Sequence, residues 1–163
     1  MEFDENKNEE IEDKYTDDDY VDIYSKRAIL GFSTIFGVIF GGVLLMLNLK
    51  AAGYKKEIGQ VLIFCIFYHF LSAFLLSSTG IKINPATLKA GAAGAQLSFE
   101  ELKPSLLLFA ITLVINVIGG LVLTKYFFKK YFPDEDYYPK PIWTPLLVSI
   151  LIALAASYIL RIG

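Results

Sequence analysis

Four long stretches without a charged side chain constrain this chain more than any other feature. They cover residues 28–49, 58–81, 105–124 and 141–160, and each is 20 to 24 residues long. At about 1.5 Å per residue, a helix of that length spans a hydrocarbon layer of roughly 30 Å. A charge at the centre of such a helix costs about 2.5–3.5 kcal/mol on insertion scales. The pattern therefore predicts four membrane-spanning helices.

The predicted fold is all-α, a four-helix transmembrane bundle in up-down order formed by residues 26–163. The short connection 50–57 favours an antiparallel hairpin. The longer connection 82–104 opens with an N-cap, Asn84, and closes with a capping box of Ser98 and Glu101. We expect a short amphipathic helix at 99–103. The Ala/Gly-rich residues 90–95 fit either a surface loop or a re-entrant segment.

Residues 1–25 form an acidic segment that is predicted to be a disordered tail. Residues 1–22 carry eleven acids against Lys7 and Lys14, whereas the remainder of the chain is net positive. Apolar residues are too sparse there to offset the entropy lost on ordering. The segment is either a solvated tail or one that binds a basic partner, and like-charge repulsion disfavours nucleic acid.

The chemistry-bearing residues are few. The single cysteine, Cys65, excludes an intramolecular disulfide. Cys65 and His69 share a helix face, but no third strong ligand lies at that depth, so we expect no metal and no cofactor. The acidic N-terminus lacks the basic start of a secretory signal, so the first stretch is expected to be retained.

Small and polar residues recur every four positions in three of the stretches. Lipid provides no hydrophobic drive for helix association, so close backbone packing must supply it. We expect these faces to turn inward, toward a second copy, or toward a partner membrane protein. They comprise Ser33, Gly37 and Gly41 in the first, Thr112, Asn116 and Gly120 in the third, and Ser149, Ala153 and Ser157 in the fourth.

A second group of polar residues lies near the middle of the second and third stretches. His69 and Asn116 are close to the two midpoints, and an antiparallel arrangement sets Ser72 level with Thr112. Each group needs a hydrogen-bond partner where lipid offers none. This polar layer is either interhelical glue or a solute or proton site. We expect His69 to be structural and to bond to Asn116 or Thr112.

Aromatic side chains next to lysines indicate the headgroup level, and Tyr126, Tyr131 and Trp143 are the expected interfacial anchors. With four spans, the basic residues divide eight against seven between the two sides, which gives no orientation bias. An even number of spans places both termini on one side. We take that side as the cytoplasmic face of a bacterial inner membrane.

Parts of the chain resemble small bacterial multi-span membrane proteins of unassigned function. The resemblance rests on Tyr24-Ser25-Lys26-Arg27-Ala28-Ile29 leading into Gly31-Phe32-Ser33, on Phe40-Gly41-Gly42 and Asn48-Leu49-Lys50, and on Lys140-Pro141-Ile142-Trp143. It implies a multi-span membrane fold and no activity or functional residues.

Three classes of function stay open at this point. A non-catalytic accessory or assembly subunit in the lipid bilayer fits the small-residue faces best. A small carrier or channel requires the polar layer to be wet. An enzyme is disfavoured because the chain has no Gly-x-Ser-x-Gly motif and no acid in any span to orient His69.

Overall fold

The computed structural model describes residues 21–133 and 137–162, and this part of the chain is helical, as predicted. Two helices are long and apolar enough to cross a membrane, Ile58–Ser78 and the continuous rod Phe99–Tyr131. In chain order the elements are α2 (Lys26–Phe36), α3 (Val38–Ala51), α4 (Ile58–Ser78), α5 (Pro85–Ala92), α6 (Phe99–Leu121), the π-helix η2 (Val122–Phe128), α7 (Lys129–Tyr131) and α8 (Trp143–Ile162).

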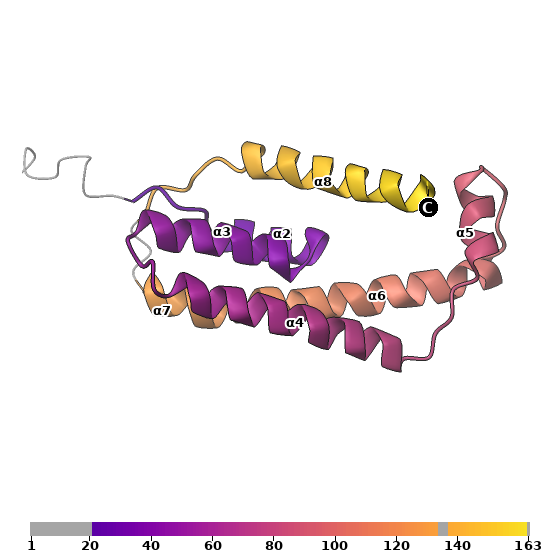
Figure 1. The fold of residues 1–163 in the computed structure, drawn as a ribbon, viewed down its shortest axis with the longest axis horizontal. Helices are drawn as coiled ribbons and strands as arrows, with labels where there is room; N and C mark the ends of the chain where they lie inside the picture. Colours follow the sequence, from indigo (N-terminus) through magenta and orange to yellow (C-terminus); the bar gives the residue numbers. More distant parts are fainter. Residues whose placement is uncertain (1–20, 134–136, 163) are drawn as a thin grey trace, which may run out of the picture.

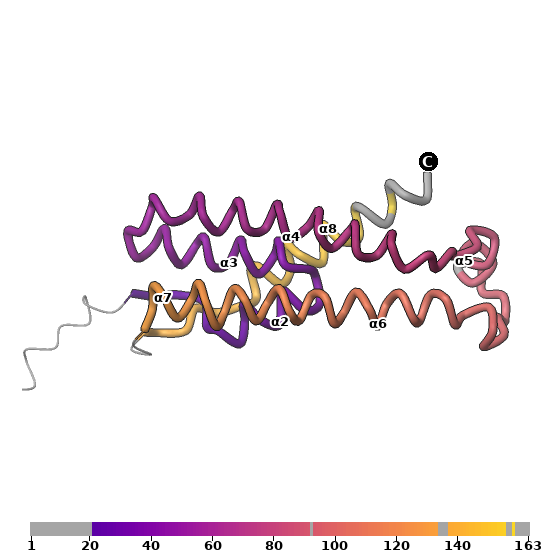
Figure 2. The backbone as a smooth tube through the Cα atoms, turned by 90° about the horizontal axis from the view of Figure 1, so that it is seen from below, coloured from indigo at the N-terminus to yellow at the C-terminus, as the bar shows by residue number. Residues whose placement is uncertain are grey.

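The first uncharged stretch is not one helix, so the predicted continuous span 28–49 is wrong. Between α2 and α3, Gly37 has φ 99° and ψ 161°, a backbone conformation that glycine adopts far more readily than other residues. The chain reverses there, and α3 packs antiparallel on α2 (Figure 2). Asn48 near the end of α3 consequently lies beside Tyr24, just before α2, at hydrogen-bond distances of 2.8 Å.

This helical hairpin is much shorter than the helices around it. At 1.5 Å per residue, α2 is roughly 17 Å long and α4 roughly 32 Å. The hairpin therefore extends along only part of α4 and α6, while α4 and the α6–α7 rod extend over most of the molecule and α8 reaches further toward the α5 end than the hairpin does (Figure 1). The start of α2 and the end of α8 lie toward opposite ends of the molecule.

Backbone hydrogen bonds hold the segment before α2 at the open end of the hairpin. Ile23 is 1% exposed. Its N–H donates to the carbonyl of Tyr138 at 3.1 Å, and its carbonyl accepts from the N–H of Lys140 at 2.9 Å. Residues 21–25, assigned above to the disordered tail, thus pack against the segment that leads into α8. Residues 1–20 of that predicted tail lie outside the described residues.

The connection between α4 and α6 carries both predicted helix caps. The side chain of Asn84 accepts from the N–H of Ala86 at 3.0 Å and starts α5. Ser98 and Glu101 form the capping box of α6, so the short helix expected at 99–103 is instead the first turn of α6. The mostly exposed α5 lies across the ends of α4 and α6 (Figure 1).

Replacing Gly37 by alanine should destabilise the fold by about 1–3 kcal/mol, because a side chain at positive φ is strained. The measurement is the thermal unfolding midpoint of the purified protein. Gly31→Ala is the matched control: Gly31 lies within α2, and a Cβ added there has nothing within 4 Å. The control should be neutral or stabilising by about 0.5–1 kcal/mol. Equal midpoints for the two variants would contradict the turn at Gly37.

Candidate functional site

Three helices approach most closely at Ser33, which is fully buried on α2. Gly41 of α3 and Gly120 of α6 face it. A Cβ added to Gly120 would lie 2.8 Å from the Cβ of Ser33, and one added to Gly41 would overlap the Ser33 hydroxyl. Only glycine fits at either position. The predicted inward packing of Ser33, Gly41 and Gly120 is therefore found, whereas Gly37 forms the turn and packs against nothing.

A second pair of glycines brings α4 into the same contact. A Cβ added to Gly42 of α3 would overlap the Sγ of Cys65 on α4. A Cβ added to Gly119 of α6 would lie 2.7 Å from the ring of Tyr68 on α4 and would overlap Val38 on α3. Gly41 and Gly120 thus let α2 contact both α3 and α6, and Gly42 and Gly119 let α4 contact the same two helices. The four glycines together mark the centre of the bundle.

Asn116 of α6 forms a hydrogen bond with the C-terminal end of α2, next to the break at Gly37. Its side-chain amide donates to the backbone carbonyl of Thr34 at 3.3 Å. Thr34 lies in the last turn of α2, where the break at Gly37 removes the next turn of helical N–H donors. A buried carbonyl without a partner costs about 1–3 kcal/mol. Asn116 therefore satisfies a backbone group that the hairpin itself exposes.

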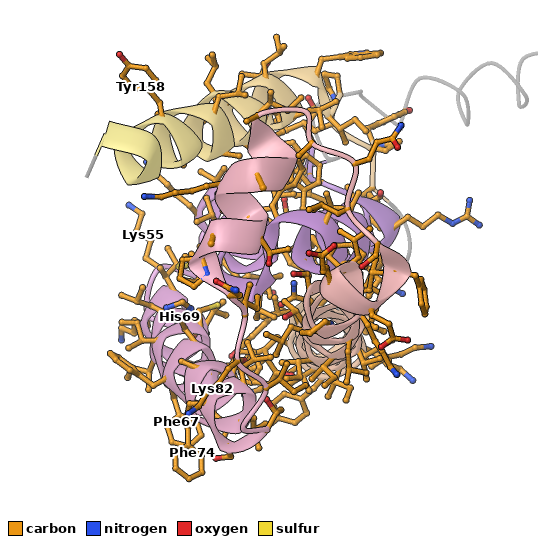
Figure 3. The ribbon with its side chains drawn as sticks, turned by 90° about the vertical axis from the view of Figure 1, so that its right-hand side faces the viewer. Lys55, Phe67, His69, Phe74, Lys82 and Tyr158 are labelled. Atoms are coloured by element: carbon orange, nitrogen blue, oxygen red, sulfur yellow. The ribbon has the colours of Figure 1, made fainter. Side chains whose placement is uncertain are left out.

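His69 does not join this contact, and its predicted bond to Asn116 or Thr112 is wrong. The side chain is exposed on the side of α4 away from α6 (Figure 3), with its ring 6.1 Å from that of Phe70. Within the described part of the chain it makes no hydrogen bond. The preceding residue, Tyr68, faces α6 instead and donates its hydroxyl to the carbonyl of Ile115 at 2.7 Å.

Two further members of the predicted polar layer, Ser72 and Thr112, form hydrogen bonds within their own helices. The hydroxyl of Ser72 donates to the carbonyl of Tyr68 at 2.7 Å, and that of Thr112 to the carbonyl of Leu108 at 2.8 Å. Every buried side-chain nitrogen or oxygen of the described residues has a hydrogen-bond partner. The four residues His69, Ser72, Thr112 and Asn116 therefore do not assemble into one site.

The inner face of α4 has a spacing that would have identified Tyr68. Val61, Cys65, Tyr68 and Ser72 are separated by four, three and four residues, the repeat of one helix face. Val61 and Cys65 are at most 2% exposed. His69 lies about 100° away from that face. The prediction above chose His69, whose side chain lies on a different face of α4 from Tyr68.

The helix α8 is packed more loosely than the hairpin. Ser149 is 3% exposed and is the one buried side chain among those described in this helix. Ala153 is exposed, and the side chain of Ser157 lies outside the described set. A groove of about 280 Å³ runs between α8 and the hairpin, lined by Tyr24, Phe32, Phe40, Val43, Leu44, Leu47, Thr144, Pro145, Val148, Ser149 and Ile152.

The three expected interfacial anchors lie at the end of the molecule where α2 begins. Trp143 and Tyr126 are exposed, at 72% and 61%. Tyr131 donates its hydroxyl to the side chain of Gln60 at 3.0 Å and packs its ring 5.7 Å from that of Tyr54. Within the described residues, no three His, Cys, Asp or Glu side chains gather as they would around a metal ion.

Comparison with protein-family models, curated proteins and solved structures finds no match to this chain. Its function is therefore inferred from the geometry above.

Tyr68→Phe should lower the free energy of unfolding by about 0.5–1.5 kcal/mol, because it removes the hydroxyl that bonds to the Ile115 carbonyl. His69→Leu, one residue along, should leave stability within experimental error. Thermal unfolding of the two variants and the wild type in the same detergent gives the comparison. A larger loss for His69→Leu than for Tyr68→Phe would contradict the orientation of α4.

Asn116→Leu should cost about 1–3 kcal/mol, because it leaves the Thr34 carbonyl buried without its donor. Thr112→Val, one turn earlier on the same helix, is the matched control, since its hydroxyl bonds only within α6. Denaturant unfolding monitored by tyrosine and tryptophan fluorescence measures both. Equal losses for both variants would show that the contact between Asn116 and Thr34 does not stabilise the hairpin.

Proposed function

We propose that this chain is an integral membrane protein in which α4, the α6–α7 rod and α8 cross the bilayer. The hairpin of α2 and α3 enters and leaves on one side. Large apolar side chains on α4 support this placement: Ile63, Phe67, Phe70 and Phe74 are 66–70% exposed. Phe67 and Phe74 project away from the bundle (Figure 3). Such a surface is rare in water and ordinary in lipid.

The distribution of positive charge supports one orientation. The end where α2 begins holds Lys26, Arg27, Lys50, Lys55, Lys56, Lys125, Lys129, Lys130 and Lys140, and the opposite end holds Lys82, Lys89, Lys103 and Arg161. Cytoplasmic segments carry the excess of Lys and Arg in membrane proteins. The start of α2 is then cytoplasmic and the end of α8 lies across the membrane, and the basic residues are distributed as in a bacterial inner-membrane protein.

Cysteine labelling tests the topology. In a Cys65→Ala background, Ser25→Cys and Ala52→Cys should both be labelled by an impermeant maleimide from the cytoplasmic side only, because the hairpin returns to the side where it starts. Thr79→Cys, at an exposed position between α4 and α5, should be labelled only from the outside. Labelling of Ser25→Cys and Ala52→Cys from opposite sides would show that residues 28–49 span the bilayer and would overturn the re-entrant hairpin.

The role that the geometry supports best is that of a non-catalytic assembly subunit. The observation that supports this role is the loose packing of α8: among the described side chains of this helix, only Ser149 is buried. Grooves of about 340 and 280 Å³ open beside it, and both are lined in part by Phe32. The larger part of the α8 face is therefore available to the apolar helix of a partner, which is either another membrane protein or a second copy.

A small carrier or channel is the second candidate, because a helix break near mid-bilayer is a feature of transporters. Backbone of that kind is tolerated only where protein covers it or water lines it. Here Asn116 supplies a protein partner, and the buried polar side chains of the described residues are all paired. The covered arrangement favours assembly. Labelling of Ile39→Cys, near the hairpin tip, by a charged impermeant reagent would favour transport instead.

Photo-crosslinking tests the assembly role in native membranes. Benzoylphenylalanine replaces Val148, which lines the groove, or Leu151, which is 65% exposed and does not line it. We expect a discrete protein adduct from position 148 and little from 151. An adduct of twice the chain mass identifies a second copy. Lipid adducts alone, or the same protein adducts from both positions, would overturn the role of this face.

A further inference from the structure

A cationic cavity of about 390 Å³ lies where the start of α2 meets the end of the α6–α7 rod. Among the described residues, its lining contains four positively charged residues and no carboxylate. The lining residues are Lys26, Arg27, Leu30, Leu121, Thr124, Lys125, Lys129 and Pro133. The cations come from two helices that are far apart in sequence, so the cavity is a product of the hairpin packing against the rod.

The electrostatics of this cavity favour an anion. Within residues 21–133 and 137–162, no carboxylate forms an ion pair with Arg27, Lys125 or Lys129. The ammonium of Lys26 lies 5.5 Å from the ring centroid of Phe128, which holds it at the edge of the cavity. The first turn of α2 contains no acid. The dipole of α2 adds partial positive charge at this N-terminal end of the helix.

The cavity is also amphipathic along the helix axes. Leu30 is three residues beyond Arg27 on α2, and Leu121 is four residues before Lys125 on the rod, so both lie about one helical turn deeper than the charges. On its other side, Arg27 borders the apolar groove of about 340 Å³ that continues to Ile35. A free phosphate would contact only the charged residues of the cavity. A ligand with an anionic head and an apolar tail would contact those residues and also Leu30 and Leu121.

We propose that this cavity binds the headgroup of an anionic phospholipid of the cytoplasmic leaflet. Its phosphate oxygens accept hydrogen bonds from Arg27, Lys125 and Lys129, and its acyl chain lies over Leu30 and Leu121. Basic pockets between helices on the cytoplasmic side are the usual form of such sites. The inference rests on the proposed membrane placement. A bound lipid would join α2 to the rod at the open end of the hairpin.

Lipid binding to the purified full-length chain tests the site. Native mass spectrometry measures the affinity for phosphatidylglycerol and for phosphatidylcholine with the same acyl chains. The wild type should prefer phosphatidylglycerol. Lys125→Gln combined with Lys129→Gln should lower the affinity for phosphatidylglycerol roughly thirtyfold, from the usual contribution of each lysine near an anionic surface. Lys55→Gln combined with Lys56→Gln removes the same charge at the same end outside the cavity, and should keep the wild-type affinity.

Three results would overturn the site. They are equal affinity of the wild type for the two lipids, equal losses for the two double variants, and displacement of phosphatidylglycerol by millimolar inorganic phosphate. The last would identify free phosphate as the ligand. Thermal unfolding shows that the variants remain folded. The cysteine labelling above reads the membrane placement separately: correct labelling without a lipid preference refutes this site alone, and incorrect labelling refutes the placement on which it rests.

Discussion

The contact of Ser33 with Gly41 and Gly120 is the constraint on which the hairpin depends. Two short antiparallel helices bury little surface between them, and in lipid they gain no hydrophobic energy by associating. They are held by the close approach that two glycines permit and by the donor that Asn116 supplies to the broken end of α2. Asn116 and Gly120 are one turn apart on α6, so a single helix face provides both. The hairpin and α6 therefore pack as one unit.

The open end of the hairpin is closed by a different kind of contact. Asn48, 1% exposed, both accepts from and donates to the backbone of Tyr24, and Ile23 shares two backbone hydrogen bonds with the segment before α8. These bonds join the start of α2 to the end of α3 and to the segment before the loosely packed α8. They also fix the start of α2 beside the rod, which is what brings its two cations next to Lys125 and Lys129.

The sequence predicts most of the helices but not the reversal of the first. Hydropathy and length locate α4, the rod and α8 to within a few residues, except that the rod is longer at both ends, and the four-residue spacing identifies Ser33, Gly41, Asn116 and Gly120 as inward-facing. Neither the hydropathy nor the four-residue spacing reveals the break at Gly37, because a hairpin of 22 apolar residues has the same hydropathy and length as one span. Gly37 fits a packing face and a turn equally well. Only partners distant in sequence decide between them.

The distribution of basic residues gives a separate argument on whether residues 28–49 form one span or a hairpin. With residues 28–49 as one span, the basic residues divide almost equally between the two sides, and insertion has no preferred orientation. Reversal at Gly37 moves Lys26 and Arg27 to the side of Lys50 and of the lysines at the end of the rod. In the proposed membrane placement, the same glycine conformation that allows α3 to pack on α2 therefore produces the charge asymmetry that orients membrane proteins. A helix break introduced by packing alone would have no reason to do so.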